Sequence, residues 1–212
     1  MLILSLVWFG STFGYYGTII TVARIFSNMD SKDNQQASFD YEAFLISSLA
    51  EIVGAAIIWQ MVEKLGRVPT IVTALIGAGL SLFLLCFVVS LGRNLQIFFA
   101  FSSRVFEMMI SSTVWIITPE LLSTDVRTSG HGIASAIARI GGCLSPYIVT
   151  GASLPTVGII MLTVHATTAL VASRLPETRG AAMGRSSTVS LIVHGPYRSE
   201  RAADNHEIHR LT

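Results

Sequence analysis

Two short charged loops interrupt long apolar runs in this sequence: EKLGR at residues 63–67 and TPELLSTDVR at residues 118–127. The apolar runs around them are long enough to cross a bilayer, since about 20 mostly apolar residues span its hydrocarbon core. There are six such runs, at residues 2–23, 41–62, 70–90, 95–117, 131–152 and 154–173. The pattern predicts an all-α integral membrane protein with six transmembrane helices.

The composition supports a membrane protein and argues against other broad classes. Of the 212 residues, 51% are hydrophobic and only 13% are charged, whereas soluble domains carry about 25% charged residues. A net charge of +1 gives no indication of the basic surface that nucleic-acid binding requires. The sequence contains no metal-ligand spacing, phosphate-binding loop or recognisable nucleophile–base motif. We therefore expect no metal, no cofactor and no enzymatic activity.

The chain divides into an apolar part and a polar tail. The first run starts at Leu2 without a basic leader and is as long as a full span, so we interpret it as a true helix rather than a signal peptide. Residues 1–175 are predicted to form the six-helix membrane domain. Residues 176–212 are polar and charged, and we expect them to form a cytoplasmic, largely disordered tail.

Basic residues divide unequally between the two sides of the predicted bundle. One side holds Lys64, Arg67 and Arg127 together with six arginines after residue 173. The loops on the other side hold three basic residues against four acidic ones. Because loops rich in Lys and Arg stay in the cytoplasm, both termini are predicted to be cytoplasmic.

The ionisable residues Glu51, Arg104 and Glu107 fall well inside the predicted spans. Charges near the bilayer centre cost about 2.5–3.5 kcal/mol on insertion scales, so these side chains should face the bundle interior. Arg104 and Glu107 are three residues apart on one helix face and could pair with each other. The alternatives are a structural pair that ties helices together and a substrate or proton site. For Glu51, the alternatives are a proton-coupling group and a polar anchor.

The first span also carries a polar aromatic face. Trp8, Ser11, Thr12 and Tyr15 follow helical spacing, and Tyr16 is adjacent to them. Rings that carry hydroxyl groups suit a wet cavity, because one end is apolar and the other forms hydrogen bonds. An interfacial aromatic belt is the alternative. We predict a substrate path that contains Tyr15, Tyr16, Glu51, Arg104 and Glu107.

Four segments in order resemble one family of carriers: residues 8–17 (WFGSTFGYYG), 48–67 (ending in EKLGR), 118–142 (starting with TPELLSTDVR) and 176–180 (PETRG). The chain resembles the C-terminal six-helix half of a major facilitator superfamily carrier of the sugar and organic-ion porter branch. Within that branch it is most similar to the synaptic vesicle 2-related proteins. The resemblance implies one half of a carrier whose two halves rock about a central site.

The resemblance also implies a cytoplasmic gate. Acidic residues at the helix ends would pair with arginines and close the cytoplasmic side of the outward-facing carrier. The residues expected in this gate are Glu63, Gly66, Arg67, Glu120, Arg127, Arg139, Glu177 and Arg179.

Two functions follow as expectations. The first is transport of a small organic solute or ion by alternating access, with proton coupling left open and the chain present as a C-terminal half or a truncated carrier. The second is a degenerate facilitator module that binds partners without transporting anything. Either protein would be a multi-pass component of a plasma or vesicle membrane, in contact with lipid. A second six-helix half is the partner that the first function implies.

The predicted topology can be tested with an epitope tag after Thr212. We expect this tag to be protected from protease added outside sealed, right-side-out cells, because the basic loops place the C-terminus in the cytoplasm. A tag inserted in the loop at residues 27–40 is the control and should be cleaved. Cleavage of the C-terminal tag from outside would reverse the assignment.

Overall fold

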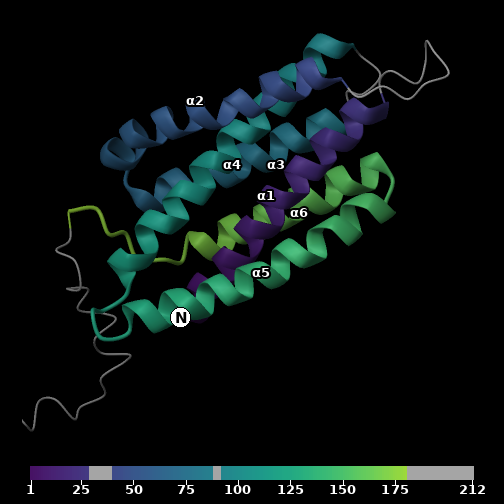
Figure 1. The fold of residues 1–212 in the computed structure, drawn as a ribbon. Helices are drawn as coiled ribbons and strands as arrows, with labels where there is room; N and C mark the ends of the chain where they lie inside the picture. Colours follow the sequence, from purple (N-terminus) through teal and green to yellow (C-terminus); the bar gives the residue numbers. More distant parts are fainter. Residues whose placement is uncertain (29–39, 88–91, 181–212) are drawn as a thin grey trace, which may run out of the picture.

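The computed structural model describes residues 1–28, 40–87 and 92–180, which form six long helices (Figure 1). These are α1 (Leu2–Asn28), α2 (Tyr41–Leu65), α3 (Arg67–Phe87), α4 (Arg93–Leu121), α5 (Arg127–Gly151) and α6 (Leu154–Ala172). Most of the predicted long loop, the end of the third apolar run and residues 181–212 of the predicted tail lie outside the described residues.

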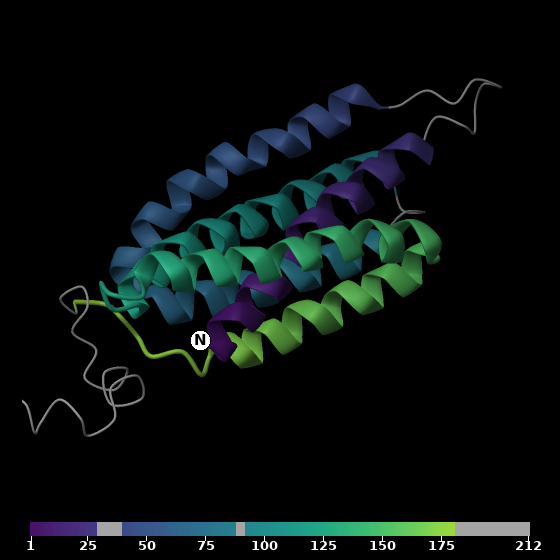
Figure 2. The same cartoon turned by 60° about the horizontal axis from the view of Figure 1, so that its bottom comes forward.

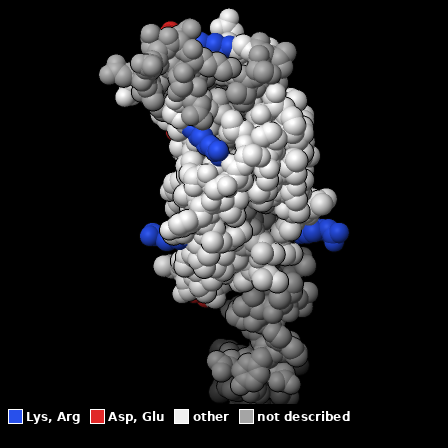
Figure 3. All heavy atoms as spheres, turned by 90° about the vertical axis from the view of Figure 1, so that its right-hand side faces the viewer, with Lys and Arg blue, Asp and Glu red and all other residues white. Residues whose placement is uncertain are grey.

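All six helices are long and apolar enough to cross a membrane, which confirms the predicted all-α membrane fold. Uncharged side chains dominate the face drawn in Figure 3, where only isolated Lys and Arg side chains project. The largest difference from prediction is α4, which begins at Arg93 and ends at Leu121 rather than covering residues 95–117. A helix can continue into polar sequence beyond the apolar run that marks its membrane segment.

Helix α1 is central to the bundle (Figures 1 and 2). It packs along α5 and also contacts α4 and α6, while α3 packs against both α4 and α6. Helix α2 lies on the outer side of α4. Because α1 touches helices on several sides, polar groups on its different faces meet different neighbours.

The helices are tied together at the end of the bundle opposite the N-terminus. Asp40 caps α2 by accepting a hydrogen bond from the Ala43 N–H at 3.0 Å, and it also pairs with Arg93 at the start of α4 at 2.7 Å. The hydrogen bonds from Arg93 lower the pKa of Asp40 against the opposing effect of partial burial. Arg24 of α1 donates to the Val149 and Ala152 carbonyls at the end of α5, both at 2.7 Å. A cation at a helix C-terminus satisfies carbonyl groups that have no helical partner.

The contact between α1 and α5 depends on a glycine. A Cβ atom at Gly141 would lie 2.6 Å from the backbone oxygen of Phe9, a distance that real Cβ atoms essentially never show. Small residues allow helices in membranes to approach closely and to gain van der Waals contact. Gly141 therefore determines how closely α5 packs against α1.

We expect Gly141→Ala to push α1 and α5 apart and to lower thermal stability, by about 1–3 kcal/mol if it behaves as other overpacked cores do. Gly132→Ala in the same helix is the control, since nothing lies within 4 Å of its Cβ position and alanine favours a helix over glycine. Thermal unfolding of both variants in lipid nanodiscs tests this. Equal melting temperatures for the two variants would contradict the proposed role of Gly141.

Candidate functional site

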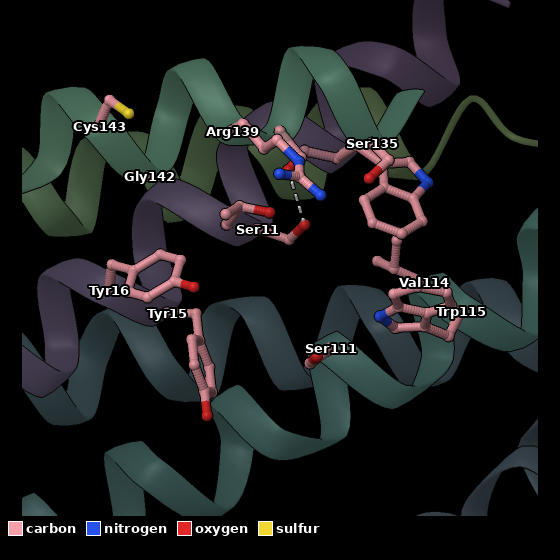
Figure 4. A pocket seen from close by; sticks show the side chains of 13 residues that line it. Ser11, Tyr15, Tyr16, Ser111, Val114, Trp115, Ser135, Arg139, Gly142 and Cys143 are labelled. Atoms are coloured by element: carbon pink, nitrogen blue, oxygen red, sulfur yellow. Dashed lines mark hydrogen bonds between the residues drawn. The ribbon is translucent and has the colours of Figure 1, made fainter. Parts of the chain in front are cut away.

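A cavity of about 640 Å³ opens between α1, α4 and α5 (Figure 4). Its lining combines aromatic rings, hydroxyl groups and one arginine: Trp8, Ser11, Thr12, Tyr15, Tyr16, Ser111, Val114, Trp115, Ser135, Ala138, Arg139, Gly142 and Cys143. The polar aromatic face of the first span thus lies on the cavity wall. Cavities of this size with a few polar groups are typical of small-molecule sites.

Arg139 is the one charged side chain among the described residues that line the cavity. It projects from α5 toward the space that Tyr15, Ser111 and Trp115 surround (Figure 4). It was expected in the cytoplasmic gate, and the structure places it elsewhere. The physical reason is helix length: twelve residues separate it from Arg127 at the start of α5, or about 18 Å at 1.5 Å per residue.

One end of the cavity is built from packed aromatic rings. The Trp8 and Trp115 rings pack edge to face, with their centroids 5.2 Å apart. The His131 ring packs against both, with its centroid 5.3 Å from that of Trp8 and 4.8 Å from that of Trp115. The Trp8 indole N–H donates to the Thr118 hydroxyl at 2.9 Å. These contacts hold the indole rings in place, so that this wall is formed before any ligand enters.

The intramembrane charges pair across helices rather than along one helix. Arg104 of α4 forms an ion pair with Glu51 of α2 at 2.6 Å, and the Tyr15 hydroxyl of α1 donates to the same Glu51 oxygen at 3.2 Å. The sequence had suggested a pair between Arg104 and Glu107. Instead, Glu107 faces His165 of α6, because the tertiary packing brings a partner for each charge from a different helix.

His165 is the residue that sequence reasoning missed. Its Nε2 atom lies 2.8 Å from Glu107 Oε1, and the side chains of His165 and Glu107 are only 1% and 2% exposed. The Thr18 hydroxyl of α1 donates to the same carboxylate oxygen at 2.8 Å. The one available signal was a histidine inside an apolar span, where ionisable residues are rare and tend to be functional.

Two of the residues predicted for the gate form an ion pair at one end of the bundle. Arg67 at the start of α3 pairs with Glu120 near the end of α4 at 2.9 Å, and its Nε atom also donates to this carboxylate. The Thr178 hydroxyl donates to Glu120 as well. Residues 176–180, assigned to the tail by sequence, therefore contact both α3 and α4 at this end of the bundle.

Glu177 acts as a cap for α3 rather than as a partner for an arginine side chain. Its carboxylate accepts hydrogen bonds from four backbone N–H groups: Arg67 and Val68 at 2.9 Å, Arg179 at 3.0 Å and Thr178 at 3.1 Å. Partial burial opposes ionisation, but these donors hold the pKa of Glu177 below its usual value. Carboxylates are stabilised at helix N-termini.

Gly66 makes room for this carboxylate. It adopts φ +101°, a conformation that favours glycine, and a Cβ atom there would lie 2.8 Å from Glu177 Oε2.

The other predicted gate residues have different environments. Arg179 donates to the Lys64 carbonyl at 2.7 Å, so it also attaches the 176–180 segment to the end of α2. Arg127 donates to the Leu122 carbonyl at 3.4 Å within its own loop. Glu63 is exposed. Within the part of the chain that the structure describes, neither Arg127 nor Glu63 forms an ion pair.

Fold and site together define a multi-pass membrane protein with a cavity at mid-bundle and a polar cluster at one end. The model of the family described as "Sugar (and other) transporter" matches residues 1–186, and the chain belongs to this family. The six helices correspond to one half of a major facilitator bundle.

Relatives of several kinds are similar to this chain. "Organic cation/carnitine transporter 7" of Arabidopsis thaliana is 29% identical over 71% of this chain and 31% of its own length. "Synaptic vesicle 2-related protein" of Rattus norvegicus is 28% identical over 88% of this chain and 37% of its own length. "Solute carrier family 22 member 7" of Sus scrofa is 30% identical over 82% of this chain and 30% of its own length. The chain thus spans about a third of the length of these relatives.

The attachment of residues 176–180 should depend on acidic pH. The pKa of Glu177 is lower in the folded protein than in a free carboxyl group. The ionised side chain therefore stabilises the attached segment at pH values above the ordinary carboxyl pKa, and this stabilisation is lost as the pH falls through the lowered value. A spin label at Pro176→Cys, in a Cys86→Ala, Cys143→Ser background, should be immobilised at neutral pH and become mobile in acid.

Glu177→Gln should mobilise this label already at neutral pH, because an amide has one acceptor oxygen instead of two. Glu63→Gln, an acid at the same end without a described ion pair, is the control and should leave the spectrum unchanged. A label in Glu177→Gln that stays as immobile as in the parent would refute the capping role.

Proposed function

We propose that this chain forms one wall of a translocation path and takes part in moving a small organic solute across a membrane by alternating access. The observation that carries the proposal is the cavity between α1, α4 and α5, which presents aromatic rings and hydroxyl groups at mid-bundle. The family supports it, since relatives named as a transporter and a solute carrier align with 71% and 82% of this chain.

We propose further that the preferred solute carries an anionic group next to an apolar or aromatic part. Arg139 brings a positive charge into the cavity, and no acidic side chain lines it among the described residues. Its guanidinium group can donate two parallel hydrogen bonds to a carboxylate or sulfonate. The rings of Trp8, Trp115 and Tyr15 would contact the apolar part.

A second six-helix body would supply the opposite wall. The cavity is bounded by only three helices, and the relatives are about three times as long as the aligned segment. Several large apolar side chains on α2 and α5 are also exposed, including Trp59 at 76% and Tyr147 at 80%. In the membrane, these exposed side chains would be covered either by lipid tails or by the apolar surface of a second half.

The cargo proposal can be tested with three phenyl compounds of similar size and different charge: anionic benzenesulfonate, neutral benzenesulfonamide and cationic phenyltrimethylammonium. Fluorescence of Trp8 and Trp115 reports binding in a Trp59→Phe background. We expect benzenesulfonate to bind tightest and Arg139→Gln to weaken it about tenfold to a hundredfold, since a hydrogen bond to a charged group contributes about 1.5–3 kcal/mol. Arg174→Gln removes an arginine outside the cavity and should have no effect.

Transport itself is measured as uptake of radiolabelled benzenesulfonate into liposomes that contain the full 212-residue chain, with and without a co-reconstituted N-terminal half of a relative. Uptake that depends on Arg139 supports the carrier. Binding without uptake under both conditions favours the alternative function, a module that binds but does not transport. Tightest binding of phenyltrimethylammonium would overturn the assignment of an anionic cargo.

A further inference from the structure

Glu107 and His165 meet at the junction of three helices, away from the cavity wall. Glu107 comes from α4, His165 from α6, and Thr18 from α1 donates to the carboxylate. Both side chains of the pair are almost completely buried, at 2% and 1% exposure. Neither belongs to the predicted gate nor lines the 640 Å³ cavity.

The hydrogen bonds of His165 determine how many protons the pair holds. Its Nδ1 atom lies 2.7 Å from the Met161 carbonyl oxygen, which can only accept, so Nδ1 carries a hydrogen. In a neutral imidazole the other nitrogen, Nε2, is then a bare acceptor. Nε2 faces Glu107 Oε1 at 2.8 Å. If Glu107 were also ionised, two lone pairs would point at each other at hydrogen-bond distance.

The contact is therefore a hydrogen bond only when one proton lies between the two atoms. Either His165 is an imidazolium that donates to a carboxylate, or Glu107 is a carboxylic acid that donates to a neutral imidazole. The two states differ in the location of the proton and not in the number of protons. The adjacent pair of Arg104 and Glu51 has no such requirement, because a guanidinium group carries its own hydrogens.

The surroundings favour retention of this proton. The ionisable groups that line one narrow crevice with Glu107 are Arg104 of α4, Glu51 of α2 and Tyr15 of α1. Helix α3 presents Gly79 to His165, and the Ser145 hydroxyl of α5 lies beside Gly17 of α1. Arg104 and Glu51 cancel each other, so loss of the proton would leave one net negative charge in a buried cluster. An uncompensated buried charge is costly.

Helix α1 depends on this junction. A Cβ atom at Gly14 would lie 2.8 Å from His165 Nε2 and 3.3 Å from Glu107 Oε1, so α1 passes directly over the pair. Thr18, one turn further along, forms the hydrogen bond. On the adjoining part of the same face, α1 presents Ser11 and Tyr15 to the cavity. A change at the junction can therefore shift the cavity wall.

We propose that Glu107 and His165 form a proton-binding site, which holds one proton between Oε1 and Nε2 and thereby ties α4 to α6 directly beneath α1. Release of the proton turns this contact into a repulsion at the point where α1 packs over it. The link from this release to solute binding rests on the proposed function, whereas the proton site itself does not.

The proton is tested on the full chain in lipid nanodiscs, without any solute. At pH 7, ¹⁵N-histidine spectra report whether Nε2 of His165 is protonated, and infrared spectra report whether a buried carboxylic acid is present. We expect one of these two signals, its loss at high pH, and its assignment by disappearance in Glu107→Gln. Absence of both signals at pH 7 overturns the proposal, whether or not the chain binds benzenesulfonate.

The contribution of the proton to helix packing is tested by the pH dependence of thermal stability. The melting temperature of wild type should fall by a few degrees as pH rises and the proton is lost. The melting temperature of Glu107→Gln should not fall in this way, because its amide N–H donates to Nε2 and cannot be titrated away. Glu63→Gln is the control: this exposed acid lies outside the junction, so the variant should keep the wild-type pH dependence. An unchanged pH dependence in Glu107→Gln overturns the proposal.

A third measurement separates the two proposals. If the proton site regulates the cavity, the affinity for benzenesulfonate changes with pH in wild type and not in Glu107→Gln. Proton signals with no benzenesulfonate binding would support the proton site while the proposed cargo fails. Benzenesulfonate binding with no proton signal would overturn the proton site and leave the cargo proposal standing.

Discussion

The pairing of charges inside the bilayer is the constraint on which the rest of this structure depends. Hydrocarbon offers no water to a buried carboxylate or guanidinium, so each must find its partner within the protein. Glu51 meets Arg104 across α2 and α4, and Glu107 meets His165 across α4 and α6. Helix α4 contributes a member to both pairs. These contacts therefore link α4 to both α2 and α6.

Helix α1 connects the cavity with the two intramembrane charge pairs. Its Tyr15 and Thr18 hydroxyl groups donate to the two buried carboxylates, while Trp8 and Ser11 line the cavity. Near the end of the bundle opposite the N-terminus, Arg24 holds the last carbonyls of α5. One helix therefore contacts a cavity wall and two charge pairs, so that a movement of α1 alters all three. This arrangement would provide a physical basis for the proposed coupling between a buried proton and a bound solute.

The gate end of the bundle combines two kinds of contact with different strengths. The pair between Arg67 and Glu120 is partly exposed to solvent, at 20% and 15%, and such pairs contribute modestly. Glu177 instead accepts hydrogen bonds from two backbone N–H groups at the start of α3 and from two in its own segment, so no donor side chain has to be ordered. The α3 terminus therefore helps to hold the segment after α6 without a side-chain ion pair. If this end forms the proposed gate, few ion pairs would have to separate for it to open.

The sequence by itself determined the six helices, the family and the polar face of α1, because hydropathy, helical spacing and the motifs at residues 63–67 and 176–180 are local features of the chain. Only the tertiary structure decided which charge meets which. Arg104 and Glu107 are three residues apart and looked like a pair, yet each is bound by a different helix. Arg139 lines the cavity, and only the structure shows that His165 contacts Glu107. Partners more than 50 residues apart are brought together by helix packing, and no local pattern encodes that proximity.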